Sequence, residues 1–193
     1  MAKKDLINSL QYIIDTIEDA LDKGADNAAF ICALSIPDIC SQIEFSRKYI
    51  KDHSNGESYA RWYNENFYLY ENPSETKINQ LDGDIMFDLR CKMFHEGSID
   101  HKNIQKKLKK KYTDKFKEEF RQESPKGVIL KFKINMNANR ESVVFGYSED
   151  SITPKVINVD VNVNQSELAK RITGTAKGVI SDFKKNNPTS IKR

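Results

Sequence analysis

The residues best suited to catalysis lie close together in the segment 88–97, where four residues separate Arg90 from His95. Histidine titrates near neutral pH and can accept or donate a proton, and the guanidinium of arginine matches the oxygens of a phosphate group. Cleavage of RNA without a metal needs both functions, because the ribose 2′-hydroxyl must lose a proton while charge accumulates on the phosphoryl oxygens. The pair therefore predicts a phosphodiester-cleaving site with Arg90 and His95 as its catalytic residues.

The spacing of this pair also predicts how the site is assembled. Residues 84–95 have helical periodicity, and Gly97 is placed to end the helix. Five steps along an α-helix leave Arg90 and His95 about 140° apart around the axis and about 7.5 Å apart along it. One straight helix does not present the two side chains together, whereas two facing copies bring both residue types to one cleft. We therefore expect a homodimer.

A structural role for the same residues is the alternative. Arg90 would then anchor a carboxylate, and His95 would cap the end of its helix. The carboxylates available to Arg90 in this interpretation are those of Asp88, Glu44 and Asp38. Both roles are compatible with the residue types and their spacing.

A lysine-rich segment begins a few residues after His95. Residues 102–117 contain eight lysines and one acid, Asp114. Apolar residues recur every four positions, which predicts an amphipathic helix with a cationic outer face that attracts phosphate groups. The apolar residues are Ile104, Leu108, Tyr112 and Phe116. The residues predicted to bind RNA are Lys106, Lys107, Lys109, Lys110 and Lys111. The alternative is a solvated lysine-rich surface, whose charge Glu118 and Glu119 reduce.

Familiar cofactor and hydrolase motifs are absent from the sequence. It contains no Gly-x-Gly-x-x-Gly, no P-loop, no Gly-x-Ser-x-Gly and no Cys-x-x-Cys. Cys91 and His95 stand one helical turn apart, and Cys32 and Cys40 could complete a zinc site with them. Cys32 and Cys40 fit better as core residues, because they lie among apolar neighbours. We expect neither a metal nor a cofactor.

Apolar periodicity predicts a helical first half of the chain. The first helix covers 5–22 and ends at Gly24, and a second is capped by Asp26 and breaks at Pro37. Aromatic residues then recur at mostly helical spacing. They face the core in the interpretation we favour and form a base-stacking surface in the other. These residues are Tyr59, Trp62, Tyr63, Phe67 and Tyr70.

From Gly127 onward the hydrophobic period changes to two, which is typical of half-buried strands. The alternation predicts strands near 130–134, 143–147 and 157–163. Residues 137–140 have the composition of a hairpin loop between the first two strands. We therefore expect a small antiparallel sheet with one solvated face.

The last helix is expected after the cap residue Asn164 and before Pro188. The whole pattern predicts an α+β fold that is mostly α: a helical bundle with a small C-terminal antiparallel β-sheet and a final helix. The bundle would cover 1–122. The sheet and the final helix would cover 123–193 and pack on the bundle as one structural unit.

The composition is that of a globular protein. The 193 residues are 38% hydrophobic and carry a net charge of +3, so attraction to nucleic acid has to come from a local patch. The mean hydropathy is −0.65, and no apolar stretch is long enough to span a membrane. The N-terminus lacks the apolar core of a signal peptide, so we expect a cytoplasmic protein that does not bind a membrane.

The order of several short motifs carries a resemblance to a known superfamily. Ile36-Pro-Asp-Ile-Cys40 is followed by Ile43-Glu44, then by Tyr59-Ala-Arg-Trp-Tyr63, and then by Leu89-Arg-Cys-x-x-x-His95-Glu-Gly. This pattern resembles that of the HEPN superfamily, whose signature is Arg, four to six residues and then His. It resembles in particular a group of bacterial HEPN-like proteins with an Arg-x4-His motif. The resemblance covers residues 5–100 in detail and the remainder in outline. It implies a helical bundle, metal-independent endoribonuclease activity and a dimer with paired Arg and His at its seam.

One position departs from the pattern. Cys91 stands directly after Arg90, where active HEPN ribonucleases often carry Asn, Asp or His. Cys91 and Glu96 are the supporting residues of the predicted site, and Glu96 either forms a hydrogen bond across it or lies in solvent. The resemblance leaves two functions open: a homodimeric endoribonuclease or RNA-binding protein, and an inactive module that binds RNA, a nucleotide or a protein. It implies a role in phage defence, toxin–antitoxin pairs or stress response, with an antitoxin or defence protein as partner.

Overall fold

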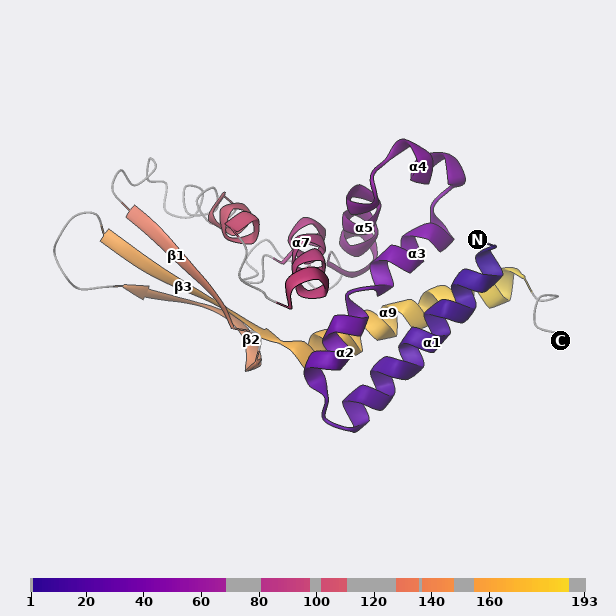
Figure 1. Cartoon of the computed structure of the whole chain (residues 1–193), viewed down its shortest axis with the longest axis horizontal. Helices are drawn as coiled ribbons and strands as arrows, with labels where there is room; N and C mark the ends of the chain where they lie inside the picture. The colour runs from indigo at the N-terminus through magenta and orange to yellow at the C-terminus, as the bar shows by residue number, and fades with distance from the viewer. Residues whose placement is uncertain are drawn as a thin grey trace.

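The chain is α+β and mostly α, with a small sheet and a final helix, as predicted (Figure 1). The computed structural model describes residues 2–68, 81–97, 102–110, 128–135, 137–147 and 155–187. Its helices are α1 (Lys3–Asp22), α2 (Asp26–Ala33), α3 (Ile36–Glu44), α4 (Arg47–Asp52), α5 (Asn55–Tyr63), the π-helix η1 (Asn64–Tyr68), α7 (Gly83–Glu96), the helix 102–110 and α9 (Gln165–Asn186). Its strands are β1 (Val128–Asn135), β2 (Asn137–Tyr147) and β3 (Lys155–Asn164). None of the helices in these ranges is long and apolar enough to cross a membrane.

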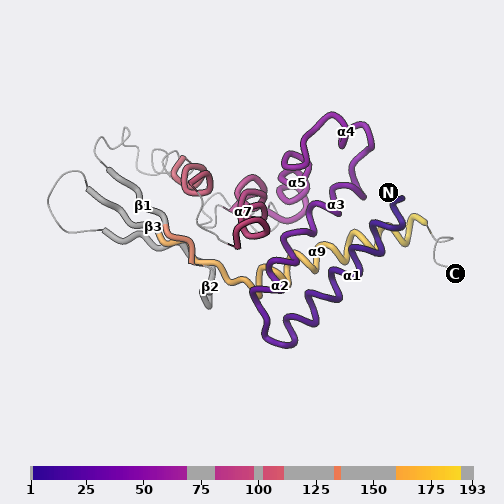
Figure 2. Tube along the Cα trace, viewed as in Figure 1, coloured from indigo at the N-terminus to yellow at the C-terminus, as the bar shows by residue number. Residues whose placement is uncertain are grey.

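Two long helices, α1 and α9, run side by side in opposite directions and carry much of the core (Figures 1 and 2). Each presents an apolar residue every three or four positions, which creates one apolar face. Fully buried side chains on these faces include Leu10, Ile14 and Ile17 in α1 and Ile172 and Ala176 in α9. Helices α2 and α3 pack against both of them, so α9 belongs to the same core as the N-terminal helices.

The helix boundaries follow local sequence signals. Gly24 lies just after α1 with a φ of +69°, a left-handed conformation that favours glycine. Pro37 stands in the first turn of α3, so the predicted break is confirmed. Asn164 caps α9, because its Oδ1 accepts a hydrogen bond from the backbone N–H of Glu167 at 3.1 Å. Asp26 does not cap α2 as predicted; it is the first residue of that helix, where a negative charge is favourable.

The predicted aromatic residues face the core. Tyr59, Trp62, Tyr63 and Phe67 are at most 3% exposed. Tyr70 lies outside the described residues. The four buried rings therefore stabilise the fold through the apolar area they remove from water and do not form a base-stacking surface.

Helix α7 starts at a close contact with α5. A Cβ atom on Gly83 would lie 2.3 Å from the carbonyl oxygen of Ala60, so only glycine permits this approach. The backbone N–H of Gly83 also donates a hydrogen bond to Oδ1 of Asn64 at 2.8 Å. These contacts fix the start of the helix that carries Arg90 and His95.

The sheet has the strand order β1-β3-β2 and extends away from the long helices (Figure 1). β2 pairs with β3 in the antiparallel direction, with Val143 opposite Val161. β1 pairs with β3 in the parallel direction, with Phe132 opposite Val159, so the prediction of a purely antiparallel sheet is wrong. The predicted hairpin loop 137–140 is also wrong, because these residues are the first part of β2. Alternating hydrophobicity indicates which face of a strand is buried, but not which strand lies beside it.

Candidate functional site

The two predicted catalytic residues lie on one uninterrupted helix, α7. Oδ1 of Asp82 accepts a hydrogen bond from the backbone N–H of Ile85 at 3.2 Å and so caps the start of the helix. Gly97 ends it in a left-handed conformation with a φ of +62°. Because α7 is continuous between Arg90 and His95, the two side chains remain about 140° apart around its axis. A single chain does not bring them side by side.

Arg90 forms an ion pair with α3. Its Nη2 lies 2.8 Å from Oδ2 of Asp38, and the two side chains are 25% and 11% exposed. The guanidinium carbon also lies 5.2 Å from the centre of the Phe94 ring, which is a cation–π contact. Arg90 thus has the carboxylate partner that the structural alternative requires. A quarter of the Arg90 side chain remains accessible.

Asp38 belongs to a largely buried polar cluster. Its Oδ1 accepts a hydrogen bond from Nδ2 of Asn55 at 3.0 Å. Burial raises the pKa of the Asp38 carboxyl, whereas the positive charge of Arg90 and the Asn55 hydrogen bond lower it. Tyr59 is fully buried, and burial together with the charge of Asp38 raises the pKa of its hydroxyl well above the usual value, so it stays neutral. The cluster holds the Arg90 guanidinium in position through Asp38.

The C-terminal end of α7 is exposed. His95 is exposed and forms no hydrogen bond or ion pair with any residue that the structure describes. Phe94, the preceding residue, is 48% exposed although it is large and apolar. The helix end is closed by the N–H of Gly97, which donates to the Met93 carbonyl at 3.0 Å, so His95 does not cap it. The imidazole is therefore accessible to a ligand.

The two supporting residues differ in burial. Glu96 pairs with Lys92 one turn earlier on α7, and its side chain is 58% exposed. Cys91 is half-buried and close enough to Tyr59 to affect the pKa of that residue. Within the described ranges, no three His, Cys, Asp or Glu side chains gather into a group that could hold a metal ion.

The helix 102–110 lies beside α7 (Figure 1). It carries several lysines. Its buried apolar side chains are Ile104 and Leu108. Nζ of Lys107 lies 2.7 Å from Oδ2 of Asp88 and donates to the carbonyl of Asp84 at 3.3 Å, so Lys107 anchors this helix to α7. The exposed members of the predicted RNA-binding set are Lys106, Lys109 and Lys110. Lys111, Tyr112 and Phe116 lie outside the described residues.

The sequence does not predict Asn55 as a site residue, and it predicts Tyr59 either in the core or on a base-stacking surface. The available signal is Asp38 itself, an acidic residue within the short apolar stretch 36–40. A carboxylate in such a run needs polar partners, because an unpaired charge in a buried position is costly. The sequence does not indicate which distant residues supply them.

The chain matches no protein-family model, no curated protein and no solved structure in the three comparisons made. The resemblance to the HEPN superfamily therefore depends on the sequence motifs alone. Support for a function has to come from α7 and the side chains around it.

Proposed function

We propose that the chain is a cytoplasmic HEPN-like protein that acts on RNA as a homodimer and cleaves it without a metal at the end of α7. The exposure of His95 carries this proposal. Its side chain has no partner among the described residues and follows an exposed Phe94. It lies on the same helix as Arg90, which Asp38 holds in place. The lysines of the helix 102–110 lie next to α7 and supply positive charge for phosphate groups.

Arg90 and His95 perform different parts of the proposed reaction. Arg90 stabilises negative charge on the phosphoryl oxygens, because its guanidinium is oriented by Asp38 and its side chain is 25% exposed. His95 either accepts the proton of the ribose 2′-hydroxyl or donates a proton to the departing 5′-oxygen. One histidine cannot perform both steps at once, so His95 of a second copy performs the other.

Replacing Lys106, Lys109 and Lys110 with Gln is expected to weaken RNA binding regardless of sequence, because these exposed side chains neutralise phosphate groups. The slope of log K against log salt concentration should fall by about 2, which corresponds to three contacts at about 0.7 each. Filter binding over a salt series measures both quantities.

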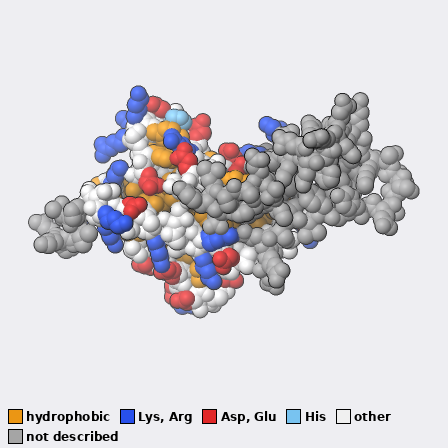
Figure 3. Space-filling model, turned by 180° about the vertical axis from the view of Figure 1, so that it is seen from behind, with side chains coloured by type: hydrophobic (Ala, Val, Ile, Leu, Met, Phe, Trp, Pro, Cys, Tyr) orange, Lys and Arg blue, Asp and Glu red, His pale blue; other side chains and the backbone are white. Residues whose placement is uncertain are grey.

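The matched control for this test is the triple variant Lys4→Gln, Lys48→Gln and Lys170→Gln, which removes the same charge from exposed positions on α1, α4 and α9. Charges of both signs are interspersed over the helical part of the face in Figure 3, so net charge alone does not direct RNA to one place. Equal effects of the two triple variants would contradict a binding role for the helix 102–110.

Replacing Phe94 with Ser is expected to weaken the homodimer about tenfold or more, because an exposed aromatic side chain at the centre of an interface contributes strongly to affinity. Sedimentation velocity over a concentration series measures the effect. The control is Tyr12→Ser, which removes an aromatic side chain that is 74% exposed on α1. A wild-type chain that stays monomeric, or a Phe94→Ser variant as dimeric as Tyr12→Ser, would contradict a dimer formed through α7.

The second candidate is a HEPN-like module without catalysis, which binds RNA, a nucleotide or a protein. The Arg90 ion pair favours it, since a guanidinium already paired with Asp38 has a structural role without any substrate. Cys91, in place of the polar residue common in active HEPN proteins, points the same way. Under either function the proposed setting is phage defence, a toxin–antitoxin pair or stress response, with an antitoxin or defence protein as partner.

A further inference from the structure

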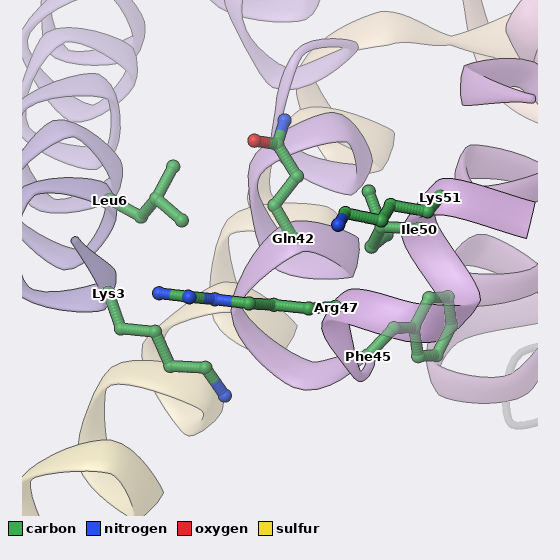
Figure 4. Close-up of a pocket in the computed structure, with 7 residues that line it drawn as sticks. All are labelled: Lys3, Leu6, Gln42, Phe45, Arg47, Ile50 and Lys51. Atoms are coloured by element: carbon green, nitrogen blue, oxygen red, sulfur yellow. The ribbon is translucent and has the colours of Figure 1, made fainter. Parts of the chain in front are cut away.

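We propose that a basic pocket between α1, α3 and α4, separate from α7, binds a phosphate monoester. The pocket has a volume of about 390 Å³, which is within the usual range for sites that bind small molecules. Its cationic lining residues are Lys3 from α1 and Arg47 and Lys51 from α4. Figure 4 shows the Arg47 side chain extending toward Lys3 and Leu6 of α1, and the Lys51 side chain extending toward Gln42 of α3. No acidic side chain is among the described residues that line it.

The three cations have no partner among the residues that the structure describes. Neither Lys3, Arg47 nor Lys51 forms an ion pair or hydrogen bond with any residue in the described part of the chain. Several lysines elsewhere on these and neighbouring helices do pair with acids. Like charges held around one opening repel each other, and a bound anion relieves that repulsion. Arg47 adds a planar group of donors that matches two phosphate oxygens at once.

An apolar wall completes the pocket and argues for an organic phosphate. Leu6, Phe45 and Ile50 line it together with the cations. The Phe45 ring is fixed by two contacts: its centre lies 4.9 Å from that of Tyr49 and 4.8 Å from the guanidinium carbon of Arg61. A rigid apolar surface beside three positive charges suits a phosphate group attached to a small apolar or aromatic group.

The neighbouring pocket shows what distinguishes this one. The neighbouring pocket has a volume of about 510 Å³. Lys3 lines both pockets, but the neighbouring pocket is also lined by Glu44 and Asp182. Their carboxylates offset the charge of Lys3 on that side, so the second pocket does not favour an anion. Arg47 and Lys51 are therefore the residues that define the proposed anion site.

Titration calorimetry of the full chain with phenyl phosphate, phenol and inorganic phosphate tests the proposal. Phenyl phosphate should bind more tightly than inorganic phosphate, and phenol should not bind. Arg47→Gln and Lys51→Gln should each weaken phenyl phosphate binding about tenfold, as expected for the loss of one charge-assisted hydrogen bond. Lys48→Gln is the matched control, because Lys48 is exposed on the same helix but does not line the pocket.

Competition against phenyl phosphate identifies the source of the phosphate group. Displacement by an oligoribonucleotide with a 5′-phosphate, but not by its 5′-hydroxyl form, supports the pocket as a site for an RNA end. Displacement by AMP but not by either RNA supports it as a site for a free phosphorylated compound. Absence of saturable phenyl phosphate binding, or equal losses in Lys48→Gln and Arg47→Gln, overturns the proposal. Since phenyl phosphate, phenol and inorganic phosphate are not RNA substrates of α7, failure of the calorimetry leaves the cleavage test at His95 unaffected.

Discussion

Replacing Arg90 with Met is expected to lower the free energy of unfolding by about 2–3 kcal/mol at neutral pH. Met keeps most of the aliphatic length of Arg90 but removes the charge that pairs with Asp38 at 2.8 Å. The Asp38 carboxylate, which is 11% exposed, is then left without its cation. Urea denaturation monitored by circular dichroism measures the loss.

This loss should depend on pH in a defined direction. Burial raises the pKa of Asp38 in the folded state, and Arg90 lowers it, so removing Arg90 raises the pKa further. A carboxyl with a raised folded-state pKa stabilises the fold at low pH, and this contribution is lost as the pH rises through that pKa. The penalty of Arg90→Met should therefore be largest at neutral pH and shrink as the pH falls through the raised folded-state pKa of Asp38, where this carboxyl becomes protonated.

The double variant Asp38→Asn/Arg90→Met provides the control. Asn at position 38 keeps an oxygen for the Asn55 hydrogen bond but carries no charge, so the variant should lack this pH-dependent penalty. The two substitutions together should also be less destabilising than the sum of the single effects. A penalty for Arg90→Met that is equal at neutral and acidic pH would show that the Asp38 pair contributes little to the stability of the fold.

The local structure was largely predictable from the sequence, and the contacts between distant segments were not. Gly24, Pro37 and Asn164 mark helix ends through backbone preferences that act within a few residues, and all three predictions are confirmed. The burial of Tyr59 and Trp62 followed from helical periodicity in the same way.

Strand order and the partner of Arg90 depend on contacts between residues far apart in the sequence. The alternation of apolar and polar residues in β1 and β3 predicted that both are strands. Whether the two strands pair in parallel depends on the path of the chain between them, which the alternation does not indicate. Arg90 and Asp38 meet because α3 and α7 both pack against α5, whereas residue types alone left three carboxylates as candidates. The pocket lined by Arg47 and Lys51 also depends on contacts between distant segments, since Lys3 at the start of α1 lines it as well.

Replacing His95 with Ala is expected to reduce RNA cleavage about 100-fold or more, because general acid–base catalysis by a positioned side chain contributes at least that factor. Stability should remain close to that of the wild type, since His95 is exposed and has no partner among the described residues. The control is His53→Ala at the end of α4, where an exposed histidine contacts the carbonyl of Tyr49 and stacks on its ring. That variant should cleave RNA at the wild-type rate.

The most direct measurement is the rate at which the purified chain cleaves end-labelled RNA in the presence of excess chelator. The account predicts cleavage by the wild type and by His53→Ala, with products that carry a 2′,3′-cyclic phosphate because the 2′-hydroxyl is the nucleophile, and loss of cleavage in His95→Ala. Equal cleavage by the wild type and His95→Ala would show that the end of α7 is not a catalytic site. RNA binding without cleavage by the wild type would contradict the enzymatic proposal and support the inactive HEPN-like module.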